Sequence, residues 1–256
     1  MEKNNNFIKC GEQITPKPNG MDYKLEAGKV YLLTSDRYSD ELYLKEDSDF
    51  QMPEKYYQSA ADKRFVKKVI NTFTKTDKLT TGVLLSGIKG SGKTLMAKYI
   101  AMNSNVPIIV VDKCVCAGDI ESFFSRIETD TCVIFDELDK YWKTSYLLGF
   151  LDGVKPTGKK LVICTCNDEE EISEYLNDRC SRIRYKRDFK CLTVDAILGI
   201  LTDMMDEEKA YDVASFIADN LGVISYDNVI VFADEVKNNP EESLESILED
   251  LNIEKQ

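Results

Sequence analysis

The stretch that most constrains the fold is GVLLSGIKGSGKTLMAKYI, residues 82–100. It has the pattern of a buried strand, a glycine-rich loop and a helix, and residues 87–94 fit G-x-x-x-x-G-K-[ST]. Glycines let such a loop turn backbone N–H groups inward, and the helix N-terminus adds partial positive charge, so the combination binds phosphate. A chain that carries it is expected to form an α/β sheet with the loop at the carboxyl edge of a strand.

The segments around this loop alternate between strand and helix patterns. Apolar strands are predicted at 82–86, 106–112, 131–136 and 160–167, and helices at 60–73, 93–103, 119–128 and 145–154. Strands that are apolar throughout indicate a parallel sheet covered by helices on both faces, which is a three-layer architecture.

Both flanks of the chain differ from this alternation. The N-terminal part carries turn signals and short β-like runs at 29–34 and 41–45, whereas the residues after 190 have the pattern of four short amphipathic helices. We therefore expect a small β-rich N-terminal extension at 1–55, an α/β domain at 56–190 and a helical lid at 191–256.

Polar side chains follow two of the predicted strands directly. They are therefore expected at the carboxyl edge of the sheet, where ligands bind in open α/β folds. Asp136 and Glu137 follow the strand TCVIF, and Asn167 follows KLVICTC. In P-loop enzymes such an aspartate holds Mg²⁺ together with the hydroxyl after the loop lysine, here Thr94, while Lys93 reaches the β- and γ-phosphates. The chain has no histidine, so Glu137 is the candidate general base. A solvated strand end and an ordinary asparagine turn are the alternatives.

Composition limits the remaining function classes. The eight cysteines lack C-x-x-C spacing and are expected to be reduced core thiols, although two C-x-C pairs leave a metal site open. The net charge of -12 argues against avid nucleic-acid binding by the whole surface, but it leaves a local basic channel open. No run reaches the ~18 apolar residues of a membrane span, and the N-terminus lacks a signal-peptide core, so we expect a cytoplasmic protein.

The order of these parts resembles the AAA+ ATPases, specifically the AAA clade. That clade has a phosphate loop, a strand ending in Asp-Glu, a strand ending in T-x-N, an R-x-x-R pair and then a helical lid. The matching segments here are TCN (165–167) and RCSR (179–182). The segment around LLGFLDGV (147–154) is most similar to the Bcs1-like AAA proteins. A phage-encoded AAA protein also fits, and its location would then be the host cytoplasm.

The resemblance implies a role for each matching residue. Thr94 and Asp136 would ligate Mg²⁺, Glu137 would be the catalytic glutamate, and Asn167 would sense the γ-phosphate. Arg179 and Arg182 would reach the ATP bound by a neighbouring subunit; a basic surface turn with weak salt bridges is the alternative. The residues implied to bind ATP are Gly87, Ile88, Lys89, Gly90, Ser91, Gly92, Lys93, Thr94 and Asp136.

The implied function is hydrolysis of MgATP between the subunits of a homo-oligomeric ring, with a hexamer expected, to remodel a macromolecule. The acidity of the chain favours a protein substrate. The alternatives are a DNA-directed AAA+ protein, such as a helicase loader or clamp-loader subunit, and a nucleotide-switched assembly protein with little turnover. CVCAGD (114–119) lacks the aromatic residue of pore loops that thread polypeptide, and Tyr56 and Tyr57 fit either stacking on adenine or packing in the core.

Overall fold

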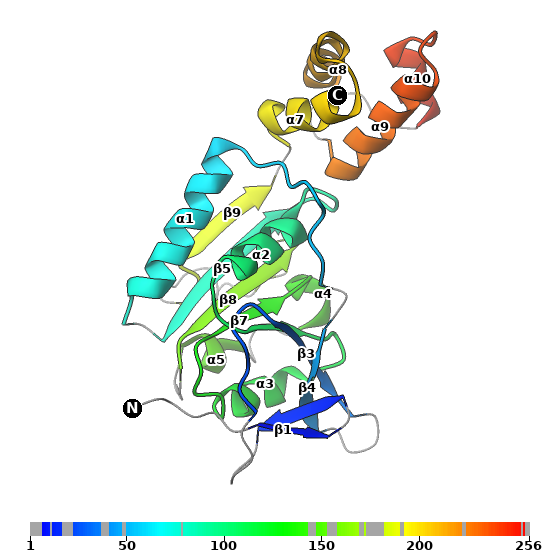
Figure 1. Ribbon diagram of the computed structural model, residues 1–256. Helices are drawn as coiled ribbons and strands as arrows, with labels where there is room; N and C mark the ends of the chain where they lie inside the picture. Colours follow the sequence, from blue (N-terminus) through cyan, green and yellow to red (C-terminus); the bar gives the residue numbers. More distant parts are fainter. Residues whose placement is uncertain are drawn as a thin grey trace. The chain divides into compact units, whose positions relative to one another are not determined.

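The protein folds into two compact units, and Figure 1 labels most of their helices and strands. The first unit contains Met1–Pro53, Val66–Ser86 and Thr94–Arg187, and the second contains Glu54–Phe65, Gly87–Lys93 and Asp188–Gln256. The computed structural model describes residues 7–10, 12–16, 23–36, 41–47, 50–77, 79–142, 147–152, 158–168, 172, 182–189, 192–221, 224–251 and 253.

One sheet runs through the described residues in the order β1-β2-β4-β3-β6-β7-β8-β5-β9. Its strands are β1 Phe7–Cys10, β2 Gln13–Pro16, β3 Val30–Ser35, β4 Leu42–Glu46, β5 Thr80–Gly87, β6 Ile108–Val111, β7 Thr131–Phe135, β8 Lys160–Cys166 and β9 Tyr185–Phe189. The strands β6, β7, β8 and β5 pair in parallel, which confirms the predicted parallel sheet.

The central strands β7 and β8 are buried along their whole length. Strands of this kind exchange all their backbone hydrogen bonds with neighbours and bury both faces, which their continuous apolar sequences favour. Cys132, Cys164 and Cys166 lie in these strands as buried thiols, as the sequence predicts.

The N-terminal strands extend this sheet. β3 pairs in parallel with β6, with Tyr31 opposite Ile109 and Leu33 opposite Val111, and β4 then pairs antiparallel with β3. Tyr31 and Leu33 are fully buried in the hydrophobic core that also contains Phe135. Strands at 29–34 and 41–45 are predicted from sequence, but the sequence pattern gives no indication that they join the main sheet.

The helices of the first unit follow the predicted alternation. They are α1 Ala60–Lys75, α2 Lys93–Met102, α3 Ala117–Phe124, α4 Leu138–Tyr141 and α5 Leu148–Asp152, where α1 and α2 begin at the boundary with the second unit. Of the helix predicted at 145–154, only α5 is described, since 143–146 and 153–157 lie outside the described residues. Figure 1 shows α1 alongside β9, where the hydroxyls of Thr72 and Tyr185 are 2.6 Å apart.

The second unit contains the four predicted C-terminal helices. They are α7 Val194–Met204, α8 Glu207–Asn220, α9 Tyr226–Asn238 and α10 Leu244–Asp250, and they share a hydrophobic core of their own. Each begins at a capping side chain that accepts a hydrogen bond from the first turn: Thr193, Asp206, Ser225 and Ser243. In the described part of the chain, every helix is too short or too polar to span a bilayer.

Candidate active site

The phosphate loop connects β5 to α2 and is built from contiguous residues. Gly87 and Gly90 adopt φ angles of 133° and 77°, a left-handed region that side chains with a Cβ rarely occupy. A Cβ on Gly87 would lie 2.2 Å from the carbonyl oxygen of Phe189, so the loop also needs glycine there for space. These conformations turn the loop backbone as phosphate binding requires.

Lys93 lies inside this loop, with 7% of its surface exposed. Its ammonium donates hydrogen bonds to the carbonyl oxygens of Gly87 at 2.6 Å and Ile88 at 2.5 Å. The side chains of Ile88 and Lys89 are exposed, so only the backbone of these two residues belongs to the loop interior. A buried ammonium surrounded by loop backbone fits a polyphosphate, whose oxygens are stronger acceptors than carbonyls.

The loop also contacts the start of α9. The backbone N–H of Tyr226 donates to the carbonyl oxygen of Gly90 at 2.9 Å, and a Cβ on Gly90 would lie 2.9 Å from the Cβ of Ser225. The helical lid therefore packs directly on the phosphate loop.

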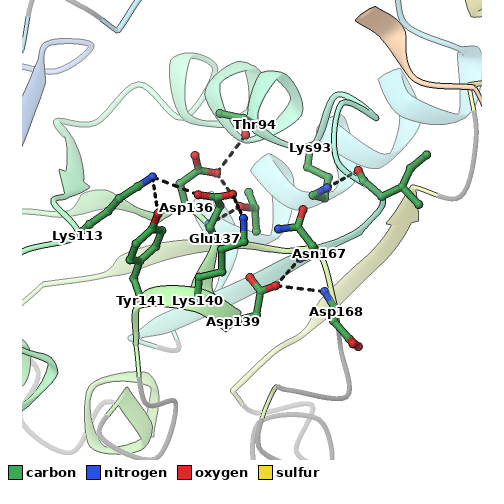
Figure 2. Close-up of polar contacts among 12 residues, drawn as sticks. Lys93, Thr94, Lys113, Asp136, Glu137, Asp139, Lys140, Tyr141, Asn167 and Asp168 are labelled. Carbon is green, nitrogen blue, oxygen red and sulfur yellow. Dashed lines mark hydrogen bonds and ion pairs between the residues drawn. The ribbon is translucent and has the colours of Figure 1, made fainter. Parts of the chain in front are cut away.

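Two hydroxyls converge on Asp136 at the carboxyl edge of the sheet (Figure 2). Thr94 Oγ1 donates to Asp136 Oδ1 at 3.1 Å, and Thr165 Oγ1 donates to the same oxygen at 2.6 Å. A carboxylate and a hydroxyl in contact supply the oxygen ligands that Mg²⁺ prefers. Thr94 and Asp136 therefore fit the magnesium site that the sequence predicts.

Glu137 follows Asp136 with a left-handed backbone, φ 55° and ψ 54°, which is uncommon for a residue other than glycine. Its N–H donates to Thr165 Oγ1 at 2.9 Å, so the buried Thr165 hydroxyl links the backbone of Glu137 to the carboxylate of Asp136. Strain of this kind concentrates at functional sites, where it aims a side chain.

The Glu137 carboxylate is held between two lysines (Figure 2). Lys140 Nζ lies 2.5 Å from Oε1 and Lys113 Nζ lies 3.1 Å from Oε2. The hydrogen bond from Lys140, followed by that from Lys113, lowers the pKa of Glu137 to about 2, against the opposing effect of desolvation. Lys113 also contacts Tyr141, with its Nζ 4.4 Å from the ring centroid. The carboxylate is thus ionised at neutral pH, and two charged hydrogen bonds weaken it as a base.

Asn167 is positioned by its backbone. Asp139 Oδ2 accepts hydrogen bonds from the N–H groups of Asn167 at 3.0 Å and Asp168 at 3.3 Å, as Figure 2 shows. Asp139 lies on α4, so the carboxyl end of β8 is tied to the helix that follows Glu137. Thr165, Asp139, Lys113 and Lys140 were assigned no role from sequence; the T of T-x-N is the signal that could have identified Thr165.

Arg182 makes an ion pair within its own chain. It is 6% exposed, and its Nε and Nη2 donate to Asp152 Oδ1 and Oδ2, each at 2.6 Å. Bidentate pairs of this type are strong and geometrically specific. Arg179, the other predicted arginine, lies outside the described residues.

Tyr57 belongs to the helical unit, and the partners of its hydroxyl and ring described here lie in that unit as well. Its hydroxyl donates to Asp203, which also pairs with Lys55 at 2.7 Å, and its ring lies 6.5 Å from that of Tyr226. Burial, followed by the hydrogen bond to Asp203, raises the pKa of Tyr57. Tyr57 therefore packs beside α7 and the start of α9.

Comparison with known proteins gives one family and a shared fold. Residues 83–188 match the model of the AAA family, described as "ATPase family associated with various cellular activities". No curated protein sequence matches the chain.

Two mutants of RuvB from Thermotoga maritima are among the solved structures with a similar fold. One aligns with a TM-score of 0.58 at 17% identity, covering 80% of this chain and 75% of that chain. The other aligns with a TM-score of 0.56 at 16% identity, covering 77% and 70%. At these identities the likeness concerns the fold alone.

The matched segment contains the Asp136–Glu137 edge, Asn167 and the whole phosphate loop. AAA domains bind ATP with Mg²⁺, and the loop and carboxylate edge described above fit both. The chain therefore contains an AAA family domain and is an ATP-hydrolysing P-loop enzyme with the AAA+ fold.

Proposed function

We propose that this enzyme hydrolyses MgATP at the interfaces of a homo-oligomeric ring, with six subunits expected, and thereby remodels a macromolecule. Lys93 and the loop backbone would bind the phosphates, and Thr94 and Asp136 would hold Mg²⁺. Glu137 would orient the attacking water, and Asn167 would contact the γ-phosphate. Bound Mg²⁺ supplies charge that stabilises the transferring phosphoryl group.

One observation carries the catalytic part of this proposal. The Thr165 hydroxyl joins the proposed metal ligand Asp136 to the backbone of the proposed base Glu137. A single buried side chain thus fixes the Asp136 carboxylate relative to the backbone of Glu137, as expected for an arrangement in which metal and water must be aligned.

The ion pair between Arg182 and Asp152 affects which arginine can reach the ATP of a neighbouring subunit. To reach a neighbouring phosphate, Arg182 would have to break its bidentate contact with Asp152. Arg179 is therefore our preferred finger, and we expect a structural role for Arg182. The ring contact would then be heterologous, with Arg179 of one subunit facing the phosphate loop of the next.

A mixing experiment tests the ring. Arg179→Ala should bind ATP normally but hydrolyse it about a thousandfold more slowly, because an arginine finger contributes at least that much. Adding Lys93→Ala subunits, which keep both arginines, should restore part of the turnover. Arg182→Ala is the comparison variant and should lower thermal stability as well as turnover.

If Arg179→Ala and Arg182→Ala both hydrolyse ATP normally, hydrolysis does not use these arginines in trans. A strictly monomeric protein under all nucleotide conditions, measured by native mass spectrometry, would contradict the ring. Very slow turnover by the unmodified enzyme, stimulated by neither protein nor DNA, would favour the nucleotide-switched assembly protein.

The acidity of residues 191–256, which accounts for the net charge of -12, supports a protein as the remodelled substrate, because an acidic surface there repels nucleic acid. A DNA-directed function is the second candidate, and the basic surface of α1 described below favours it. A cytoplasmic location, a Bcs1-like ancestry of the core and a phage origin remain predictions from sequence.

A further inference from the structure

The exposed face of α1 is basic between Lys63 and Lys68 and again at Lys75, with the neutral residues Asn71 and Thr74 between them. Successive residues of a helix are rotated by 100°, which brings these side chains onto one face. The cations of this surface, which we term the α1 basic face, are Lys63, Arg64, Lys67, Lys68 and Lys75, and all five are exposed. The sequence of α1 contains one acidic residue, Asp62, whose carboxylate instead accepts hydrogen bonds from Ser59.

Some basic side chains elsewhere in the molecule are neutralised by carboxylates. Lys9, Lys29 and Lys55 each pair with a carboxylate. Within the described ranges of the chain, no residue of the α1 basic face forms an ion pair with a carboxylate. Among the described residues, single exposed lysines without a carboxylate partner also occur elsewhere, as at Lys24 and Lys237; what sets the α1 basic face apart is that five such cations lie on one helix.

The arrangement also destabilises the helix that carries it. Lys63 and Lys67, and likewise Arg64 and Lys68, are four residues apart, and like charges at this spacing repel. The helix is nevertheless held in place, because Val66, Val69 and Phe73 are buried and Thr72 contacts Tyr185 of β9. Lys68 lies over the Tyr185 ring, with Nζ 5.8 Å from its centroid. An anchored helix thus presents a set of repelling charges to solvent.

The part of the chain that contains α1 does not share the net negative charge of the whole protein. Residues 191–256 carry 16 acidic and three basic side chains, whereas residues 1–190 carry 29 acidic and 30 basic. The charge of -12 therefore comes from the C-terminal helices, and the argument that acidity repels nucleic acid concerns that part of the molecule.

We propose that the α1 basic face is a binding site for the phosphate backbone of nucleic acid. From Lys63 to Lys75 the helix rises about 18 Å, enough to follow several consecutive phosphates of one strand. Neutralising phosphates with lysine and arginine releases condensed counterions, which drives binding without reading sequence. The exposed face carries no aromatic side chain, so base stacking contributes nothing and duplex and single strand bind through the same contacts. The site acts independently of the proposed ATP-driven function.

Fluorescence anisotropy with a labelled DNA duplex of about 30 mixed-sequence base pairs tests this proposal. Binding by the unmodified protein, measured without nucleotide, should weaken by several hundredfold between about 50 and about 200 mM salt, as expected for five phosphate contacts. Lys63→Ala/Lys67→Ala should bind more weakly and lower the slope of log K against log salt by about 2. This variant removes a repulsive pair, so loss of folding does not explain a loss of binding.

The control is Lys24→Ala/Lys237→Ala, which removes the same charge from exposed lysines elsewhere and should bind like the unmodified protein. ATP hydrolysis without DNA should be equal in all three proteins, so failure of this site is separable from failure of the enzyme. Equal affinities and slopes for both double variants would overturn the proposal. Absence of DNA binding at low salt would also overturn the proposal. If Lys63→Ala/Lys67→Ala instead abolished self-association, the α1 basic face would bind the acidic helices of a second copy and not nucleic acid.

Discussion

The phosphate loop and the carboxylate edge of the sheet are built in different ways. The loop is contiguous in sequence, and its lysine is held by its own backbone at Gly87 and Ile88. The edge joins side chains from distant segments, since Asp136 and Glu137 depend on Thr165, and Glu137 on Lys113 and Lys140. Few side chains therefore determine whether the loop binds phosphate, whereas substitutions at several positions can each change the geometry of the edge partially.

The largest expected effect distinguishes the phosphate loop, which should control ATP binding, from the carboxylate edge, which should control turnover. Lys93→Ala removes the buried ammonium of the loop and should abolish measurable ATP binding, whereas Glu137→Gln should bind ATP normally. Turnover by Glu137→Gln should fall at least about a hundredfold, as expected for loss of a general base. Equilibrium binding of a fluorescent ATP analogue and steady-state ATPase assays measure the two effects. Normal turnover by Glu137→Gln would show that the edge does not supply the base.

An intermediate loss of turnover is expected at Asp139, whose Oδ2 accepts hydrogen bonds from the backbone of Asn167 and Asp168. Asp139→Ala frees this turn and should lower kcat about ten- to a hundredfold, with little change in KM, because a small displacement of a positioned group is costly. Asp139→Asn keeps an acceptor oxygen and should recover most of the activity.

If the loss of activity in both Asp139 variants matched their loss of folded protein, the role of Asp139 would be structural alone. Circular dichroism and thermal melts of the two proteins distinguish that outcome from a loss of positioning.

The smallest effect concerns the two lysines at Glu137. The pKa of this carboxyl is about 2 in the folded protein and 4.5 ordinarily, so its ion pairs contribute stability that is complete above about pH 4.5 and is lost as the pH falls through about 2. Lys140→Met should raise the pKa of Glu137 and reduce this pH dependence, and Lys113→Met should do so less, because Lys140 makes the larger contribution. Thermal melts between about pH 3 and pH 6 measure the difference. Identical profiles for both variants and the unmodified protein would contradict this account.

The sequence predicts the loop well because all its determinants are local. Glycine spacing, the flanking strand and the helix that starts at Lys93 lie within a few residues of one another, so periodicity and motif suffice. The parallel strands β5, β6, β7 and β8 are equally visible, since each is an uninterrupted apolar run.

The contacts between distant segments could not be predicted in this way. Nothing near Lys113 in sequence indicates that it pairs with Glu137, and the buried pair of Arg182 with Asp152 joins residues 30 positions apart. The sequence pattern does not predict β9 either, because YKRDF has only one buried side chain and its charged residues hide the strand pattern. Such features are set by tertiary packing, which propensity and motif do not encode.

The hydrogen bond between Tyr226 and Gly90 has a consequence for how the lid can be uncoupled from the nucleotide loop. Both atoms belong to the main chain, so every residue type except proline at 226 retains the donor. We therefore expect this hydrogen bond to couple a displacement of the loop to the first turn of α9, whichever side chains surround it. The path of the backbone alone determines this hydrogen bond. Any sequence that keeps the fold and has no proline at position 226 should therefore keep the connection between the loop and α9.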